Sequence, residues 1–158
     1  MKAVFLDRDG VINRDLGYVH RIEDFHFIEG IFEALRYLQD LGYTLFIVTN
    51  QSGIGRGYYG IEEFEELTEF MLRRLKEEGI EIKKVYFCPH HPDQGCNCRK
   101  PEPGMVLKAA EEFGIDLKRS WLIGDKESDI EAAQRAGVGR TILLNGETLW
   151  ERIGEIKE

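Results

Sequence analysis

The chain has 158 residues, of which 42% are hydrophobic and 32% charged, and this predicts one domain with a core of ordinary size. Its formal net charge of −8 argues against a nucleic-acid binder, which needs a basic surface to neutralise phosphates. No apolar run approaches the roughly 20 residues of a membrane-spanning helix. The segment "MKAVFLDRDG" is too short in apolar residues for a signal peptide. We therefore expect a cytoplasmic protein with no membrane partner.

Apolar runs and helical patterns alternate along the chain. Continuous apolar runs, typical of strands covered on both faces, predict strands at 3–6, 44–48, 84–87, 120–124 and 141–144. Apolar residues at helical spacing predict helices at 31–42, 61–79, 105–114 and 129–137, and a helical C-terminal tail follows. This alternation is typical of an α/β fold with a parallel five-stranded sheet between helices. We expect residues 1–158 to form this single domain, and a monomer because no long apolar face is left over.

Two acidic residues, Asp7 and Asp9, follow the first predicted strand. Ligands of such sheets bind at the carboxyl ends of the strands, so polar residues there are candidates for a site. A strand's period of two would turn Asp7 and Asp9 to one side and Arg8 to the other. Two carboxylates this close repel each other and call for a cation or a shared proton. The alternative is a turn that carries a surface acid pair.

Polar residues also follow the second and fourth predicted strands. Thr49 and Asn50 offer a hydroxyl and an amide, and the glycine-containing turn "NQSG" could aim backbone N–H groups at an anion or be an ordinary polar turn. Asp125 comes where a parallel sheet would bring it beside Asp7, after Gly124, which permits close backbone approach. Asp129 could take part in the same site or be the N-cap of the following helix.

All three cysteines lie in "CPHHPDQGCNCRKP", after the third predicted strand. Their odd number excludes a complete disulfide framework, and a redox C-x-x-C motif is absent. The spacing C-x-H-x5-C-x-C offers the tetrahedral Cys3His set of a structural zinc site. We therefore predict zinc bound by Cys88, His90, Cys96 and Cys98, with His91 as the alternative fourth ligand.

Four segments together resemble the haloacid dehalogenase (HAD) phosphatases: "FLDRDGVIN", "VTNQSGIGRG", "CPHHP…CNCRKPEPGM" and "LIGDKESD". The similarity runs from Lys2 to about Leu144, and the zinc loop is typical of the branch that holds the histidinol phosphatases and heptose-bisphosphate phosphatases. The resemblance implies a three-layer Rossmann-like fold without a cap domain, in which zinc staples the loop at 88–98.

The resemblance also implies a Mg²⁺-dependent phosphatase that works through an aspartyl-phosphate. Asp7 would be the nucleophile and Asp9 the general acid and base. Thr49 and Lys100 would stabilise the transferring phosphoryl group. Mg²⁺ would be held by Asp7, Asp125 and the Asp9 backbone carbonyl. Asp129 would join through a bound water.

The substrate implied is D-glycero-D-manno-heptose 1,7-bisphosphate, a precursor in lipopolysaccharide synthesis, of which the 7-phosphate would be removed. Histidinol phosphate is the alternative, but it would need an acidic pocket for its amine, whereas Arg56 and Arg99 favour a second phosphate. The segment between His90 and Cys96 is shorter than in some heptose enzymes, which leaves the anomer open. The residues expected to contact the substrate are Asp15, Leu16, Gly17, Tyr18, Asn50, Gln51, Ser52, Arg56, Arg99 and Lys126.

Two other classes of protein share some of these features. A receiver-type signalling module also combines acids, Thr or Ser and Lys on a five-stranded parallel sheet. Its phosphorylated Asp follows the third strand, however, where this chain has Cys88. A non-catalytic zinc-holding interaction module would not need the Asp7–Asp9 pair.

Overall fold

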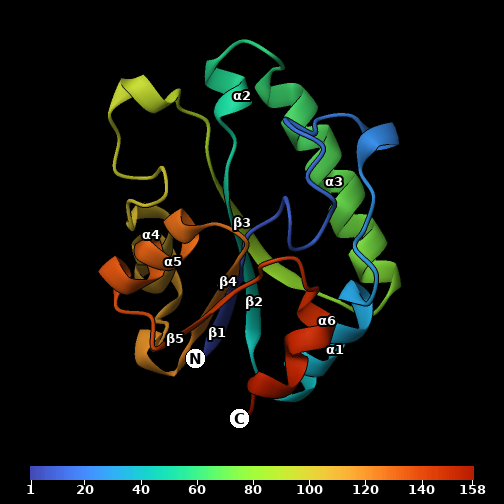
Figure 1. Cartoon of the computed structure of the whole chain (residues 1–158), viewed down its shortest axis with the longest axis vertical. Helices are drawn as coiled ribbons and strands as arrows, with labels where there is room; N and C mark the ends of the chain where they lie inside the picture. Colours follow the sequence, from blue (N-terminus) through green and yellow to red (C-terminus); the bar gives the residue numbers. More distant parts are fainter.

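The apolar residues that follow Lys2 form the central strand of a parallel sheet (Figure 1). In the computed structural model, which describes residues 1–158, this sheet has five strands in the order β3-β2-β1-β4-β5. Every neighbouring pair is parallel, so the predicted sheet is confirmed. The strands are β1 (Ala3–Leu6), β2 (Thr44–Asn50), β3 (Ile82–Cys88), β4 (Trp121–Gly124) and β5 (Arg140–Leu143).

Helices cover both faces of the sheet, which makes three layers (Figure 1). On one face lie α1 (Ile31–Asp40), α3 (Ile61–Glu77) and α6 (Leu149–Arg152), and on the other lie α4 (Gly104–Phe113) and α5 (Glu127–Ala136). Short helical turns fill several connections: α2 (Ser52–Gly55), η1 (Ile22–Asp24), η2 (Pro92–Gln94), η3 (Leu117–Arg119) and η4 (Ile153–Glu155). None of the helices is both long enough and apolar enough to cross a bilayer.

Two hydrophobic cores follow from the alternation of side chains along the strands. In β1, Val4 and Leu6 belong to the core that includes the buried residues of α1 and α3. Ala3 and Phe5 belong to the opposite core, which includes those of α4 and α5. A strand that is buried on both faces must be apolar at every position, which is why β1 reads as a continuous apolar run.

The strand order reverses next to β1, which pairs with β2 on one side and with β4 on the other. In open α/β sheets this switch point leaves a crevice beyond the carboxyl ends of the two strands. The connections on either side hold only loops and helices, from β1 through η1 and α1 to β2, and from β2 through α2 and α3 to β3. No additional domain covers the crevice.

Candidate active site

Three carboxylates converge at the switch point. Asp7 follows β1, Asp125 follows β4, and Asp129 lies in the first turn of α5. Carboxylate oxygens of all three lie within 4.8 Å of one another. Asp129 is the third residue of α5 and accepts a hydrogen bond from the backbone N–H of the N-cap residue, Lys126, at 3.1 Å. Asp129 is therefore not the N-cap itself, and its other carboxylate oxygen, Oδ1, faces the site, where it pairs with Lys100.

Two glycines let the acids approach the backbone this closely. Gly10 has φ +93°, and a Cβ atom at this position would overlap the Asp125 carboxylate. A Cβ atom at Gly124 would overlap the side chain of Asp129. The glycines of "DRDG" and "LIGD" thus make room for the cluster rather than only turning the chain.

The acid cluster has the properties of a divalent-cation site. Burial, together with the nearby Asp129 and Asp9 charges, raises the pKa of Asp7 to about 7, against the opposing effect of Lys100. Burial and the Asp129 charge also raise the pKa of Asp125. The Oδ1 atom of Asp125 is buried and has no hydrogen-bond partner. Clustered carboxylate oxygens and an unpartnered buried oxygen fit Mg²⁺, which prefers oxygen ligands.

Lys100 lies against the same acids and is only 4% exposed. Its Nζ atom lies 3.0 Å from Asp7 Oδ1 and 2.6 Å from Asp129 Oδ1, and it donates to the Val48 carbonyl at 2.8 Å. Burial alone would lower the pKa of Lys100, but the two carboxylates outweigh this and raise it. Lys100 therefore carries a positive charge beside the proposed nucleophile.

Asn50 holds Lys100 through its backbone. The Asn50 amide donates to the Lys100 carbonyl at 3.2 Å, and its oxygen accepts from the Lys100 N–H at 3.0 Å. This pair of bonds joins the end of β2 to the segment after the zinc loop. Asn50 lines the cavity, as expected for a substrate contact, but its amide group is already used inside the protein.

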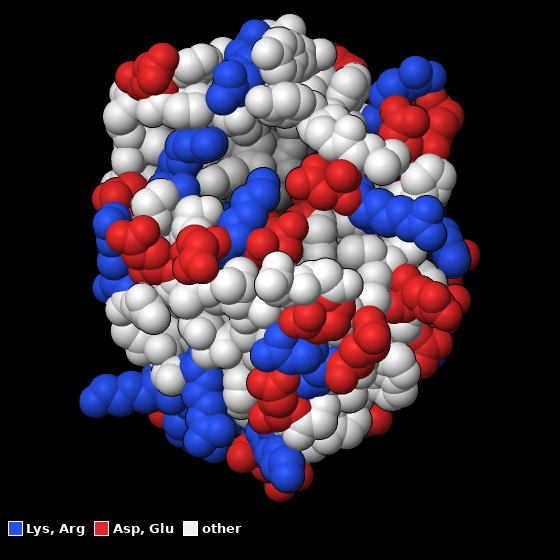
Figure 2. All heavy atoms as spheres, in the orientation of Figure 1, with Lys and Arg blue, Asp and Glu red and all other residues white.

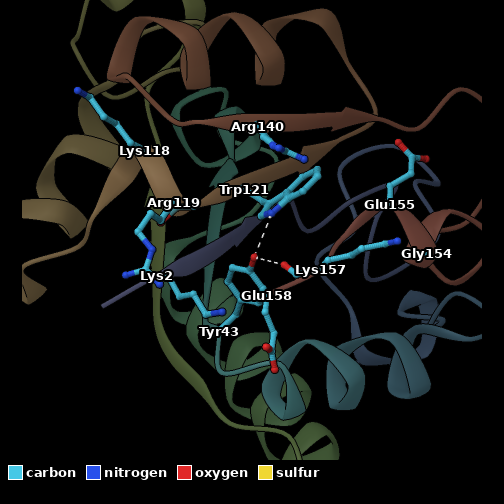
Figure 3. Close-up of a pocket in the computed structure, with 11 residues that line it drawn as sticks. Lys2, Tyr43, Lys118, Arg119, Trp121, Arg140, Gly154, Glu155, Lys157 and Glu158 are labelled. Atoms are coloured by element: carbon cyan, nitrogen blue, oxygen red, sulfur yellow. Dashed lines mark hydrogen bonds between the residues drawn. The ribbon is translucent and has the colours of Figure 1, made fainter.

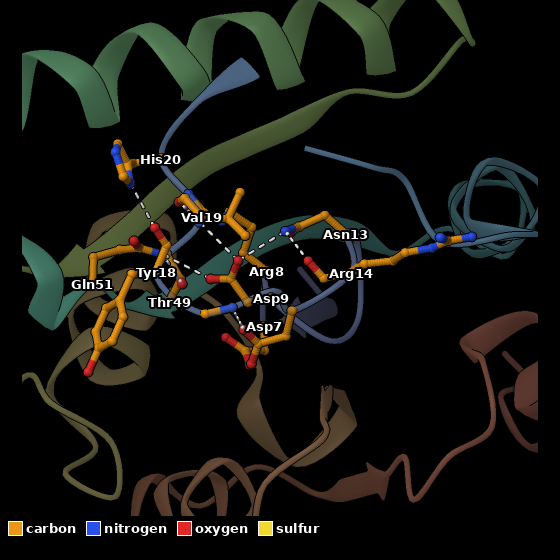
Figure 4. A network of polar contacts seen from close by, with 12 residues as sticks. Asp7, Arg8, Asp9, Asn13, Arg14, Tyr18, Val19, His20, Thr49 and Gln51 are labelled. Carbon is orange, nitrogen blue, oxygen red and sulfur yellow. Dashed lines mark hydrogen bonds and ion pairs between the residues drawn. The ribbon is translucent and has the colours of Figure 1, made fainter. Parts of the chain in front are cut away.

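Asp9 stands apart from the acid cluster, and its carboxylate is bound by its own set of donors (Figure 4). Arg8 Nη2 and Asn13 Nδ2 donate to its Oδ1 at 3.0 and 2.9 Å, and Gln51 Nε2 donates to its Oδ2 at 3.2 Å. The expectation that Arg8 points away from Asp9 is wrong. β1 ends at Leu6, so the alternation of an extended strand does not continue through residues 7–9.

An open cavity of about 510 Å³ lies over Asp9 and Lys100. Figure 2 shows a recess in the upper half of the molecule, with both basic and acidic side chains on its rim. Besides Lys100, three cationic residues line the cavity: Arg56, Arg99 and Lys126. Lys126 Nζ lies 3.9 Å from Asp15 Oδ2. Of the expected substrate contacts, Leu16 alone is not among the lining residues, and it is 59% exposed. The cavity is also lined by three residues that the sequence analysis did not single out: Tyr59, Pro101 and Ser128.

The predicted zinc ligands come together beside the end of β3. Ligand atoms of Cys88, His90, Cys96 and Cys98 all lie within 4.8 Å of one another. The sulfurs of Cys88 and Cys98 lie close enough to form a disulfide, and Cys96 lies outside this pair. His90 Nδ1 lies 3.4 Å from the Cys88 sulfur and 3.2 Å from the Cys98 sulfur, and the Cys96 sulfur lies 3.5 Å from that of Cys88. A disulfide would use two of these four atoms, whereas the convergence of all four fits a zinc ion bound by reduced thiols.

A second cavity, of about 690 Å³, lies at the opposite end of the sheet (Figure 3). Its lining comes from residues at or before the amino ends of strands and from the C-terminal tail, among them Lys2, Tyr43, Trp121 and Lys157. The hydroxyl of Tyr43 donates to the Lys157 carbonyl and accepts from the Trp121 indole at 3.3 Å. None of the clustered acids or zinc ligands lines this cavity, so its larger size does not make it the active site.

Comparison with known proteins places this arrangement among characterised phosphatases. The model of the HAD-hydrolase-like family matches residues 97–156. The D-glycero-beta-D-manno-heptose-1,7-bisphosphate 7-phosphatase of Helicobacter pylori strain J99 is 50% identical over 99% of this chain and 94% of its own length. The alpha-heptose counterpart of Campylobacter jejuni is 53% identical over 92% of this chain and 84% of its own. The structure of this chain is also similar to that of the D,D-heptose 1,7-bisphosphate phosphatase from B. bronchiseptica, solved in complex with magnesium and phosphate. The two superpose with a TM-score of 0.83 and are 35% identical, over 89% of this chain and 79% of the other.

Proposed function

The chain belongs to the heptose-1,7-bisphosphate 7-phosphatase family of HAD-like hydrolases, and from this we propose that it removes the 7-phosphate of D-glycero-D-manno-heptose 1,7-bisphosphate. The observation that carries the proposal is the convergence of Asp7, Asp125 and Asp129 with Lys100 at the switch point of the sheet. A phosphatase of this kind needs an oxygen nucleophile, a cation beside it and an open path for the substrate, and these features occur together here.

Asp7 is the proposed nucleophile. Its carboxylate attacks the phosphorus, and the bond to the sugar oxygen breaks as the bond to Asp7 forms, which gives an aspartyl-phosphate. Asp7 is 7% exposed, and Lys100, which lines the cavity, lies 3.0 Å from its Oδ1. The Lys100 ammonium would offset the negative charge that builds up on the phosphoryl oxygens during transfer. Thr49, which is fully buried near the end of β2, is the second proposed stabiliser.

Asp9 is the proposed general acid and base. It lines the cavity but is not part of the acid cluster, so it can hold a proton without interfering with the cation site. It would give its proton to the departing sugar oxygen in the first step. In the second step it would take a proton from the water that hydrolyses the aspartyl-phosphate, which returns Asp7 and Asp9 to their starting states.

Two metals are proposed, with different roles. Asp7, Asp125 and the Asp9 backbone carbonyl would hold Mg²⁺, with Asp129 contributing through a water, and the ion would supply positive charge that offsets repulsion between carboxylate and phosphate. Cys88, His90, Cys96 and Cys98 would hold zinc with no position left open for a substrate, so its role is to fix the loop that ends at Arg99 and Lys100.

The far end of the substrate is proposed to lie against Arg56, Arg99 and Lys126. These three cations line the cavity, and a second phosphate would match them through charge-assisted hydrogen bonds. Relatives named for the alpha and for the beta anomer are about equally similar to this chain, at 53% and 50% identity. Both anomers therefore belong in the substrate test.

The test is phosphate release from purified protein with Mg²⁺, over both anomers of the heptose 1,7-bisphosphate and over histidinol phosphate. We expect one phosphate per heptose bisphosphate, and a kcat/KM at least about 100-fold above that for histidinol phosphate, since a site built to bind a second phosphate discriminates strongly against a ligand without one. Preference for histidinol phosphate would reject the proposed substrate while keeping the phosphatase chemistry.

Three further expectations about the molecule belong to the same proposal. Residues 1–158 act as one domain, and a single copy of the chain supplies every proposed site residue, which supports a monomer. A cytoplasmic location fits reduced zinc thiolates. Light scattering of the purified protein measures the oligomeric state, and fractionation of the source cells measures the location.

A further inference from the structure

Both oxygens of the Asp9 carboxylate are held by buried side chains (Figure 4). Oδ1 accepts two hydrogen bonds, from Arg8 and Asn13, and Oδ2 accepts one, from Gln51. A carboxylate offers about four lone-pair sites, two on each oxygen. Oδ2 thus keeps a free lone pair, and it is the oxygen on which a transferable proton can sit.

Arg8 is a buried cation with no role in the chemistry described so far. It is 1% exposed, and its guanidinium carbon lies 5.9 and 6.0 Å from the ring centres of Phe25 and Phe64. Its Nη2 donates to Asp9 and to the Val19 carbonyl at 2.8 Å, but Nε and Nη1 are buried without a partner. Burying a charged group with unmet hydrogen bonds destabilises the fold, so stability does not explain Arg8.

Gln51 holds the second oxygen and is itself fixed on both ends. It is 3% exposed, and its Nε2 donates to Asp9 Oδ2 and to the Thr49 hydroxyl at 2.9 Å. Its Oε1 accepts from the Tyr59 hydroxyl at 2.5 Å. Its amide group is therefore fully used within the protein, and its orientation is set by Tyr59 and Thr49.

We propose that Arg8 and Gln51 are positioning residues that hold the two oxygens of Asp9 in the orientation needed for proton transfer. This inference rests on the proposed function, in which the Asp9 Oδ2–H bond breaks as the sugar oxygen leaves phosphorus and takes the proton. Arg8 does not line the cavity. Gln51 does, but its side-chain amide is bonded to Asp9, Thr49 and Tyr59, so we assign that amide to positioning Asp9 in place of the expected contact with substrate. Both residues act on the rate because a carboxylic acid that turns away from the leaving oxygen cannot protonate it.

The test compares two substrates whose leaving groups differ in whether they need a proton from Asp9. A sugar alkoxide is a poor leaving group and depends on Asp9, whereas 4-nitrophenolate leaves without protonation. The activity on each substrate is measured as kcat/KM. This constant covers the steps up to cleavage of the bond to the leaving group and excludes hydrolysis of the aspartyl-phosphate. For Arg8→Met and Gln51→Leu we expect kcat/KM for the heptose bisphosphate to fall by about 100-fold, within the range that general acid catalysis contributes. For 4-nitrophenyl phosphate we expect less than about a threefold change.

Conservative and matched variants separate positioning from folding. Arg8→Lys keeps the charge and should recover part of the loss on the sugar substrate. Arg14→Met is the matched control, because Arg14 is an exposed neighbour with no ion pair, and its side chain extends away from Asp9 in Figure 4. It should leave both substrates unchanged. If Arg8→Met does not fold, as judged by circular dichroism, Gln51→Leu provides the same comparison.

Two outcomes would overturn the inference: an equal loss on both substrates, which means a structural role, or no loss on either. The proposed substrate can fail separately. If the wild-type chain hydrolyses another alkyl phosphate instead of the heptose bisphosphate, the comparison is made with that alkyl phosphate. If the wild-type chain hydrolyses no alkyl phosphate, both the proposed function and this inference are rejected.

Discussion

The pKa of Asp7 reflects opposing effects of its surroundings. Burial and the nearby acids raise its pKa to about 7, while Lys100 opposes the shift. Below that pH the carboxyl group holds a proton, which a cation must displace; above it the carboxylate is free. The balance of these effects makes the cation site sensitive to pH near neutrality.

We predict that Mg²⁺ binds more tightly as the pH rises through about 7. Below the pKa of about 7 the apparent dissociation constant should increase by up to about tenfold per pH unit, because one proton is displaced for each ion bound. Titration calorimetry of the resting protein from pH 5.5 to 8.5 measures this. Asp7→Asn is the control and should bind weakly, without the pH dependence that the Asp7 carboxyl causes. A flat profile in the unaltered protein would contradict the prediction.

Gly10 supports a second prediction about a single residue. Gly10→Ala should reduce kcat/KM by at least about tenfold, since an added Cβ would overlap the Asp125 carboxylate and displace a proposed cation ligand. The left-handed backbone at this position would also lower the stability of the variant by roughly 1–2 kcal/mol. Gly79→Ala is the matched control, because Gly79 has φ +79° with nothing within 4 Å of the added atom. It should lose stability by the same strain and keep full activity. Equal activity in the two variants would reject the steric argument.

At the scale of one element, the loop from Cys88 to Lys100 connects a cysteine cluster to the active site. The loop begins at the end of β3, and Lys100 at its far end reaches Asp7 and Asp129. It has few buried apolar side chains, since η2 contains none. A cross-link or a metal is therefore needed to hold it. At its far end, Asn50 and the Val48 carbonyl tie Lys100 to β2.

Cys96→Ser distinguishes zinc from a disulfide as that cross-link. Cys96 is the thiol outside the Cys88–Cys98 pair, so a loop held only by a disulfide should tolerate the change. We predict instead that the variant loses zinc, that KM rises and that kcat falls, because the loop no longer holds Arg99 and Lys100 in position. Metal analysis and steady-state kinetics measure both effects. His91→Ala is the control and should keep its zinc. Unchanged zinc content and kinetics in Cys96→Ser would refute the prediction.

At the scale of the whole molecule, the active site lies open because no domain is inserted beside it. Selectivity then has to come from the walls of the cavity and not from a cover that closes over the substrate. The chain carries a net charge of −8, yet four cationic residues, Lys100 among them, line this cavity. Local cations rather than the overall field must attract a doubly phosphorylated sugar, since the net charge repels it.

Arg99→Ala should therefore change substrate selectivity more than chemistry. We predict a decrease of about 10- to 100-fold in kcat/KM for the bisphosphate, the value of one charge-assisted hydrogen bond, and a much smaller decrease for the heptose 7-monophosphate. Arg119→Ala is the matched control, because Arg119 is an exposed arginine of the cavity at the opposite end of the sheet. A decrease of equal size on both substrates would place Arg99 in the chemistry rather than at the far end of the substrate.

The local sequence pattern was sufficient for most of the fold and for much of the two groups of residues that could hold a metal ion. Apolar runs predicted all five strands. The run is continuous in β1, which is buried on both faces, whereas the edge strands β3 and β5 also hold exposed charged residues: Lys83, Lys84 and Arg140. The predicted helix at 129–137 is observed from Glu127, since the helix is capped at Lys126, earlier than its apolar residues suggest. Residue type and spacing predicted the Cys3His group. The parallel sheet predicted that Asp125 lies beside Asp7, because parallel strands bring their carboxyl ends to one edge.

The sequence by itself determined which side chains reach the active edge of the sheet, and the tertiary structure decided what each of them touches there. Arg8 turns to Asp9 because the strand ends before it, and Gln51 turns inward because Tyr59, eight residues later, supplies its donor. Asp129 meets Lys100 only when α5 packs beside the segment that follows the zinc loop. Strand alternation is a local rule that holds while the chain is extended, whereas contacts between loops depend on how distant segments pack.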